Sequence, residues 1–268
     1  MRSPSVATSA SPPVSGVPSV LGVFAHPDDE SLLAGGVLAR HAAGGARTAV
    51  VTATWSPNSA RAAELAAALT ALGAGEPRLL GYRDARNSSS APGQDRWCDM
   101  DVDVAVARVV AHIRQFRPEV VVTHDVLGQL TGHPDHRRTH QVAVLAVHAA
   151  GLGRLHPEAG EPWQASALYA ATHPDSGIDR LGPLLSGVGK TLLSVPDDYA
   201  TAVVDVTPWL EQKWAAISSH VSQVQGERAL PALLSRLDEP QRARILATEY
   251  FTRLTPTPAT AVQHSLIT

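Results

Sequence analysis

Short apolar runs alternate with longer amphipathic runs along most of the chain. Runs of strand length lie at 19–25, 46–54, 77–82, 119–125, 166–172 and 201–206. Patterns of helical period lie at 29–43, 59–73, 102–116, 133–150 and 207–224. Beyond residue 225 the pattern predicts one or two helices and a tail. Strands that alternate with helices predict an α/β fold, a Rossmann-like, mostly parallel sheet with helices on both faces.

Charged residues gather where the predicted strands end. AHPDDE, residues 25–30, follows the first strand, and THD at 123–125 ends a later one. GHPDH at 132–136 comes after a short loop. In an open parallel sheet, ligands bind in the crevice outside the carboxyl ends of the strands. The active site is therefore expected at this edge of the sheet.

The pattern also divides the chain into three parts. Residues 1–18 are rich in Ser and Pro, which interrupt every candidate apolar stretch, so we expect a disordered leader and no signal peptide. Residues 19–225 hold the alternating pattern and are expected to form the catalytic domain. We expect 226–268 to be a helical extension of that domain, which caps the sheet, forms an interface or covers the pocket.

Composition narrows the class of protein. A net charge of −3 from 22 basic and 25 acidic residues, with 4% aromatic residues, argues against a basic nucleic-acid groove with stacking rings. The single cysteine, Cys98, excludes an internal disulfide framework. No apolar run approaches the roughly 18 residues that a membrane span needs. We expect a cytoplasmic protein that binds neither nucleic acid nor membranes, and the sequence leaves its oligomeric state open.

The clustered side chains suit a hydrolytic metal site. His26 and Asp29 are three residues apart across a strand-to-helix turn. His133 and His136 have the same spacing at a helix start, where both can face one way. Two imidazoles and one carboxylate with an open fourth position are a zinc arrangement used for hydrolysis, although these ligands do not discriminate strongly against other divalent ions. Asp28 is placed to act as a general base beside the metal.

A further histidine could stabilise the oxyanion that forms when an amide carbonyl is attacked. His133 fits this role, and a neighbouring acid, Asp135 or Asp125, would hold its ring in the required tautomer. The sequence does not decide between the two acids.

The His-Pro-Asp tripeptide is also a common turn, because proline fixes φ and aspartate caps helices. The chain repeats it as THPDS at 172–176, where His173 has no second ligand nearby. We therefore treat His173 as a candidate substrate-binding residue. HPDDE and HPDH, each after a strand, together favour the functional interpretation. A GxGxxG fingerprint after the first strand is absent, which disfavours a dinucleotide site.

AHPDDE and GHPDH together resemble the N-acetylglucosaminyl deacetylase family, the LmbE/PIG-L-like zinc hydrolases. RAAEL at 61–65 resembles the family's Arg-x-x-Glu helix, and RD at 83–84 resembles its short loop motif after the third strand. VVDVTPWLEQKWAAISSHVSQ at 203–223 resembles its late strand and Lys-x-x-Ala-x-x-x-His-x-x-Gln helix. The resemblance covers residues 19 to 225, which identifies that part as a deacetylase catalytic domain.

The resemblance implies a metal-dependent amide hydrolase with one Zn²⁺ per chain. The ion would be bound by His26, Asp29 and His136, and Asp28 would activate the attacking water. The reaction would hydrolyse the N-acetyl group of an N-acetylglucosaminyl unit, releasing acetate and a free amine.

The resemblance also implies roles for residues around the metal. His133 would stabilise the tetrahedral oxyanion, with support from Asp135. Arg61 and Asp84 would contact the sugar or the group attached to it. The partner is therefore expected to be a glycosylated small molecule.

One departure from the family bears on the substrate. Members that act on glucosaminyl-inositol tend to carry Gly-Gly-Tyr before GHPDH, whereas this chain reads LGQLTGHPDH, with Thr131 in place of the tyrosine. This loop and the compact size favour the branch that tailors antibiotics, with a teicoplanin-type glycopeptide pseudoaglycone as substrate. The alternatives are deacetylation of N-acetylglucosaminyl-inositol and amide hydrolysis of mycothiol conjugates. A non-catalytic metal- or sugar-binding module is the alternative from another class.

Overall fold

The structure, a computed structural model, describes residues 16–190 and 192–254 of the 268-residue chain. Most of the expected leader, residues 1–15, lies outside the described residues, as does everything beyond residue 254. Near the first described residue the chain contacts the α1 segment, where the ring of His41 lies 2.8 Å from the carbonyl oxygen of Pro18.

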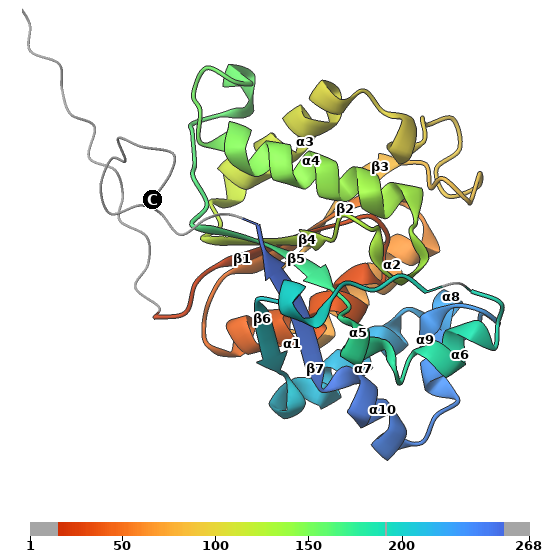
Figure 1. The fold of residues 1–268 in the computed structure, drawn as a ribbon. Helices are drawn as coiled ribbons and strands as arrows, with labels where there is room; N and C mark the ends of the chain where they lie inside the picture. The colour runs from red at the N-terminus through yellow and green to blue at the C-terminus, as the bar shows by residue number, and fades with distance from the viewer. Residues whose placement is uncertain (1–15, 191, 255–268) are drawn as a thin grey trace, which may run out of the picture.

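Seven strands form one sheet in the order β3-β2-β1-β4-β5-β7-β6 (Figure 1). The strands are β1 Val20–Phe24, β2 Thr48–Thr54, β3 Pro77–Tyr82, β4 Val120–His124, β5 Ala167–Thr172, β6 Ala202–Asp205 and β7 Thr248–Arg253. Strands β1 to β5 pair in parallel, and β7 is antiparallel to both of its neighbours, β5 and β6. The prediction of a mostly parallel α/β sheet is confirmed.

Helices fill the connections between the strands. They are α1 Asp29–Ala43, α2 Ala60–Ala71, α3 Val102–Phe116, α4 Pro134–Ala150, α5 Asp175–Ile178, α6 Gly182–Ser186, α7 Leu210–Ser219, α8 Val221–Val224, α9 Leu230–Ser235 and α10 Glu239–Leu246. In the described part of the chain, no helix combines the length and apolarity that a membrane crossing requires.

Both faces of the sheet are covered because successive strand residues point to opposite sides. On one face, Leu21 and Val23 of β1 belong to an apolar cluster that includes buried residues of α3 and α4. On the other face, Val20 and Phe24 pack in a second cluster with residues of α1, α2 and α7. Figure 1 shows α3 and α4 above the sheet and α1 and α7 below it. The strands are therefore apolar on both sides, as their sequences predict.

The C-terminal part differs from its prediction. Helices α9 and α10 agree with the expected helical extension over 226–268, but β7 follows where a tail was expected. Its sequence, TEYFTR, has only two aromatic residues, adjacent to each other, among four polar ones, and one of its buried residues is the acid Glu249. An acid at a core position hides the apolar pattern by which a strand is recognised, so β7 was missed.

The predicted helix at 207–224 is interrupted. A short 3-10 turn precedes α7, which ends at Ser219. Helix α8 begins after His220, whose backbone is non-helical at φ −79° and ψ 65°. This break turns the chain at a histidine whose side chain is fully buried.

Helix α1 also contains a break, and β7 closes it. Ala34 has non-helical angles of φ −143° and ψ 15°, so the backbone N–H groups that follow lose their partners within the helix. The carboxylate of Glu249 accepts hydrogen bonds from the N–H of Gly36 at 2.7 Å and of Val37 at 2.9 Å. It also pairs with Lys213 of α7 at 2.8 Å, and both side chains are 1% exposed. One acid on β7 therefore joins α1 and α7.

We predict that Glu249→Ala lowers the free energy of unfolding by about 3–5 kcal/mol, because it leaves the Lys213 ammonium buried without its counter-charge. The exposed Glu227 provides the matched control, and Glu227→Ala is expected to change stability by no more than about 0.5 kcal/mol. Denaturant unfolding of both variants measures the difference. Equal stability of the two variants would show that the buried pair does not hold β7 to the helices.

Candidate metal and active site

The site lies where the direction of strand order reverses. The chain proceeds outward from β1 through β2 to β3, then returns to place β4 on the other side of β1. Strands β1 and β4 pair directly, with Val20 opposite Val120 and Val23 opposite Thr123. The segments that leave their carboxyl ends, 25–29 and 124–136, therefore meet in the crevice that such a switch point creates.

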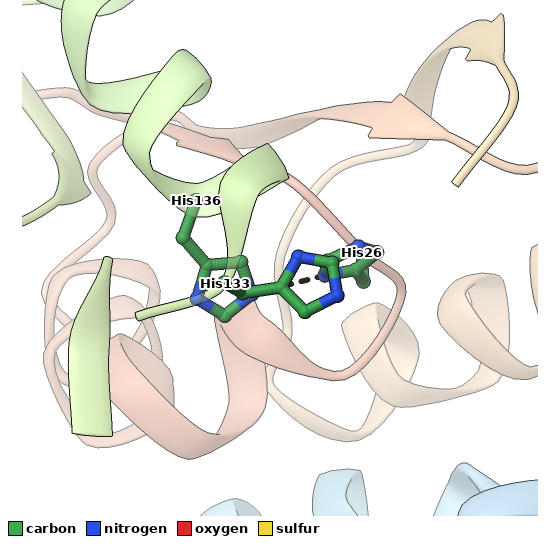
Figure 2. Close-up of side chains that lie close together, drawn as sticks. All are labelled: His26, His133 and His136. Atoms are coloured by element: carbon green, nitrogen blue, oxygen red, sulfur yellow. Dashed lines mark hydrogen bonds between the residues drawn. The ribbon is translucent and has the colours of Figure 1, made fainter. Parts of the chain in front are cut away.

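Three side chains from these two segments converge. Nδ1 of His26 lies 3.0 Å from Nε2 of His136 and 3.4 Å from Oδ2 of Asp29. Nε2 of His136 lies 3.3 Å from Oδ1 of Asp29. Figure 2 shows the rings of His26, His133 and His136 close together, with a dashed line for the contact between His26 and His136. His26, Asp29 and His136 are the side chains that the sequence predicts as metal ligands.

The donor atoms fit a zinc ion. Ligand atoms about 2.0–2.1 Å from a tetrahedral Zn²⁺ stand roughly 3.3 Å apart, and the contacts among His26, Asp29 and His136 are 3.0–3.4 Å, Asp29 facing each ring with a different oxygen. Two nitrogen atoms and a carboxylate this close repel one another unless a proton or a cation lies between them. Without a cation that place falls to a proton on His26, since the hydrogen bonds and charges of Asp135 and Asp29 outweigh its burial and raise the pKa of His26 to about 10.

Other donors lie near the cluster but are already engaged. Nε2 of His124 lies 3.3 Å from Asp29, yet it accepts the backbone N–H of Ala25 at 3.0 Å, so its lone pair is used. The Oδ2 atom of Asp135 accepts the N–H of Ala85 at 2.8 Å, and Oδ1 accepts that of Cys98 at 3.2 Å. His124 and Asp135 therefore hold the surrounding backbone in place and are not counted among the metal ligands.

The carboxylate of Asp135 orients the ring of His26, and the backbone N–H of Asp135 bonds to His133. Its Oδ2 lies 3.2 Å from Nε2 of His26 and 3.7 Å from Nδ1 of His133. The first contact is the carboxylate–histidine pairing that fixes the ring of a metal ligand. Asp125, the other acid considered from the sequence, instead accepts the N–H of Gln129 and the hydroxyl of Thr172. The structure places Asp125 in the support of a loop and not beside His133.

His133 presents a donor to the cavity. It precedes α4 as the N-cap, and its Nδ1 accepts the backbone N–H of Asp135 at 3.2 Å. The neutral ring therefore carries its proton on Nε2. Burial, joined by the charge of His26, lowers the pKa of His133 to about 3, so the neutral form prevails.

Asp28 stands beside the metal ligands with an unusual backbone. Its φ of 136° lies outside the regions that residues with a side chain prefer, and as N-cap of α1 it caps no backbone N–H with its carboxylate. That carboxylate lies 3.1 Å from the guanidinium of Arg61, which also donates to the carbonyl of Pro27 and lies over the ring of Trp55. Burial raises the pKa of Asp28 to about 6, against the opposing charge of Arg61.

One cavity of about 300 Å³ joins these groups. Every site residue predicted from the sequence lines it except Asp135, which is fully buried. The lining residues from that prediction are His26, Asp28, Asp29, Arg61, Asp84, His133, His136 and His173. Asp84 lies 3.4 Å from Nε2 of His26, and its other oxygen accepts the N–H of Arg86 at 2.6 Å.

Much of the remaining lining of the cavity is apolar and comes from α1 together with the C-terminal part. It consists of leucine, isoleucine and proline side chains of α1, α6, α9 and α10 and of the residues beside them, namely Leu32, Leu33, Leu181, Leu185, Leu230, Pro231, Leu234, Ile245 and Leu246. The residues beyond 225 thus cover the pocket, one of the three roles that the sequence left open. Apolar side chains around a few polar groups are typical of a small-molecule site.

A second buried pair lies behind Asp28 and was not singled out from the sequence. Nε2 of His220 lies 2.7 Å from Oε1 of Glu30, and both side chains are 0% exposed. Both belong to segments already noted, AHPDDE and the late helix, but nothing in the sequence shows that residues 190 positions apart touch.

The comparisons with known proteins agree with this geometry. The family model "PIG-L: GlcNAc-PI de-N-acetylase" matches residues 21–147, which include both histidine motifs. A 1D-myo-inositol 2-acetamido-2-deoxy-alpha-D-glucopyranoside deacetylase of Rhodococcus jostii is 41% identical over 239 residues, covering 76% of this chain and 81% of the relative.

Solved structures share the fold at lower identity. N,N'-diacetylchitobiose deacetylase of Pyrococcus horikoshii superposes with a TM-score of 0.61 at 19% identity, covering 88% of this chain and 83% of that one. A deacetylase in the biosynthesis pathway of teicoplanin gives a TM-score of 0.56 at 20% identity, covering 88% of this chain and 97% of that one. At these identities the likeness establishes the fold alone.

We predict that the protein binds one Zn²⁺ per chain and that His136→Ala reduces the bound metal at least tenfold, because it removes one of three ligands. His148 lies on the same helix and is exposed, so His148→Ala should keep full occupancy. Metal analysis after dialysis against a weak chelator gives the stoichiometry of both variants. Full occupancy in His136→Ala would mean that the ion binds elsewhere.

Proposed function

The chain belongs to the PIG-L family of GlcNAc-PI de-N-acetylases, and on this premise we propose that it removes the acetyl group from an N-acetylglucosaminyl-inositol. Membership of this family makes the protein an amide hydrolase that acts on an N-acetylglucosaminyl unit. The observation that carries the finer proposal is the 41% identity, over 239 residues, to a deacetylase of a 2-acetamido-2-deoxy-glucopyranoside of inositol.

His26, Asp29 and His136 would hold the metal at the floor of the cavity. When bound, the ion polarises the acetyl carbonyl and lowers the pKa of a water molecule to about 7. Asp135 would keep the ring of His26 in place through the 3.2 Å contact at Nε2, so the ligand geometry does not depend on the substrate.

Asp28 would take the proton from the attacking water. Its carboxylate lines the cavity and is not used to cap α1, and its pKa of about 6 leaves it ionised and still basic near neutral pH. Arg61 holds the carboxylate at 3.1 Å and limits its rotation. After the C–N bond breaks, the proton on Asp28 is available to the departing amine, which leaves acetate and a free amino sugar.

His133 would donate a hydrogen bond to the tetrahedral oxyanion. Its Nε2 carries the proton because Nδ1 accepts the N–H of Asp135, and the ring is neutral because its pKa lies near 3. A fixed, neutral donor in a buried site stabilises developing negative charge without reorganising.

Arg61, Asp84 and His173 are the proposed substrate contacts. They come from α2, from the loop after β3 and from the end of β5, and all line the cavity. Because Arg61 also holds Asp28, a sugar hydroxyl that contacts its guanidinium would couple substrate binding to the position of the base.

The choice of acceptor differs from the one that the sequence alone favoured. Thr131 led us to expect a glycopeptide pseudoaglycone, and this residue does lie on a 3-10 turn that lines the cavity. The relatives above 30% identity favour the inositol alternative, whereas the teicoplanin-pathway structure, at 20% identity, supports the fold and not the substrate.

The apolar wall of the cavity supports a second candidate. An inositol glycoside is polar throughout and leaves the leucine-rich wall from α6, α9 and α10 without a partner. A mycothiol conjugate carries an amide on the same glucosaminyl-inositol and an apolar group on its sulfur. Amide hydrolysis of such conjugates is therefore the alternative that this wall favours.

Acetate release by zinc-loaded protein, measured with and without a chelator, tests these proposals. We expect N-acetylglucosaminyl-inositol to have the highest kcat/KM in a panel with free N-acetylglucosamine, a glycopeptide pseudoaglycone and a mycothiol conjugate, the last followed by amine release. Preference for the conjugate would replace the deacetylase proposal with the amidase alternative, and preference for the pseudoaglycone would restore the interpretation based on Thr131.

We predict that Asp28→Asn lowers kcat by about 10²–10⁴-fold while the bound zinc stays at one per chain, because the variant loses the general base but no ligand. Asp198 is exposed and does not line the cavity, so Asp198→Asn should retain full activity. Steady-state kinetics and metal analysis on the same samples separate the two effects. Wild-type protein that binds zinc and sugar without turnover would instead indicate a binding module.

A further inference from the structure

We propose that the buried pair of Glu30 and His220 is a positioning device for Asp28. It would hold the backbone of Asp28 in the conformation that directs its carboxylate into the cavity. This inference rests on the proposed function, in which Asp28 acts as the general base.

The pair touches Asp28 through its backbone. Oε2 of Glu30 accepts the N–H of Asp28 at 3.0 Å, and Oε1 lies 2.7 Å from Nε2 of His220. The hydroxyl of Ser31 donates to Oε1 at 2.5 Å. Both oxygens of Glu30 are thus occupied, and Glu30, Ser31 and His220 are each 0% exposed.

Asp28 does not behave as an ordinary N-cap. An aspartate at this position normally has an extended backbone and accepts a hydrogen bond from an N–H in the first turn. Asp28 instead has φ 136° and ψ −24°, and its side chain caps nothing. Its N–H is bonded to Glu30, and its carboxylate meets Arg61 at 3.1 Å.

The conformation of Asp28 is costly for a residue with a side chain and persists only where surrounding contacts enforce it. Such strain concentrates at functional sites, where it aims a reactive group. The backbone hydrogen bond to Glu30 acts here together with the N–H of Leu32, which donates to the carbonyl of Asp28, and Glu30 is itself held by His220.

His220 is placed for this contact by the break between α7 and α8. A continuous helix over 207–224 was expected, but its ladder is interrupted at this residue. A buried carboxylate without a partner is strongly unfavourable, so the ring of His220 fixes the orientation of Glu30. The link from the late helix to the general base thus consists of two side chains and one backbone N–H.

Two amide variants of His220 test this link. The side chain of Gln is long enough to place its amide nitrogen at the position of Nε2. The side chain of Asn is too short for its amide nitrogen to reach Glu30. We expect His220→Gln to keep kcat within about threefold of wild type, and His220→Asn to lose about 10- to 100-fold in kcat, since a small misplacement of a catalytic group costs up to about 10². Bound zinc and KM should stay within twofold in both.

Ile113→Ala controls for lost stability. Ile113 lies on α3, in the apolar cluster on the other face of the sheet, is fully buried, and does not line the cavity. With all assays run below the unfolding temperature of every variant, Ile113→Ala should lose thermal stability and keep kcat. A kcat loss in Ile113→Ala as large as in His220→Asn, or equal kcat in the Asn and Gln variants, would overturn the positioning role.

Glu30→Gln gives an independent test if His220→Asn does not fold. The amide oxygen still accepts the N–H of Asp28, so we expect kcat within about fivefold of wild type. A loss of kcat as large as that of Asp28→Asn would assign the charge of Glu30 a direct role and overturn the proposal. Failure of the proposed function is distinguishable, because wild-type protein and Asp28→Asn would then show the same low acetate release.

Discussion

The parallel pairing of β1 with β4 is the constraint on which the site depends. Because these strands are neighbours without being consecutive, the chain leaves them in opposite directions along the sheet, and a crevice opens between. AHPDDE fills one side of it and GHPDH the other, separated by more than a hundred residues in sequence. The ligands His26 and His136 meet because their strands pair in register, and neither helix could bring them together alone.

The domain contains several buried charged groups that occur in sets whose members satisfy one another. Lys213 and Glu249 form one pair, His220 and Glu30 another, and the metal cluster a third. Buried charges are retained only where partners compensate their desolvation. The first two sets lie on the α1 side of the sheet and hold α1 and the turn before it in shapes that an unassisted helix would not adopt. The precision of the site therefore depends on residues that contact neither metal nor substrate.

Much of this could be predicted from the sequence, and the rest fails for identifiable reasons. The apolar runs mark β1 to β6, and most clearly the inner strands β1, β2, β4 and β5, which are buried on both faces. The two histidine motifs mark the metal cluster, because their ligand types and spacing are chemically restrictive. Three features escaped: β7, where Glu249 interrupts the apolar pattern, the break at His220, and the choice between Asp125 and Asp135. All three are set by contacts between distant segments, which local periodicity does not record.

The place of β7 has a consequence for the order in which the molecule assembles. Domains emerge from the ribosome with their N-terminal part first. Helix α1 is among the first elements made, yet the N–H groups of Gly36 and Val37 receive their acceptor from Glu249, which is 213 residues away from Gly36. Strand β7 inserts between β5 and β6, and the residues just before it, Leu230, Pro231, Leu234, Ile245 and Leu246, complete the apolar wall of the cavity. A nascent chain can thus form the β1–β5 core and its metal ligands early, but the closed pocket exists only once nearly all of the described chain has been synthesised.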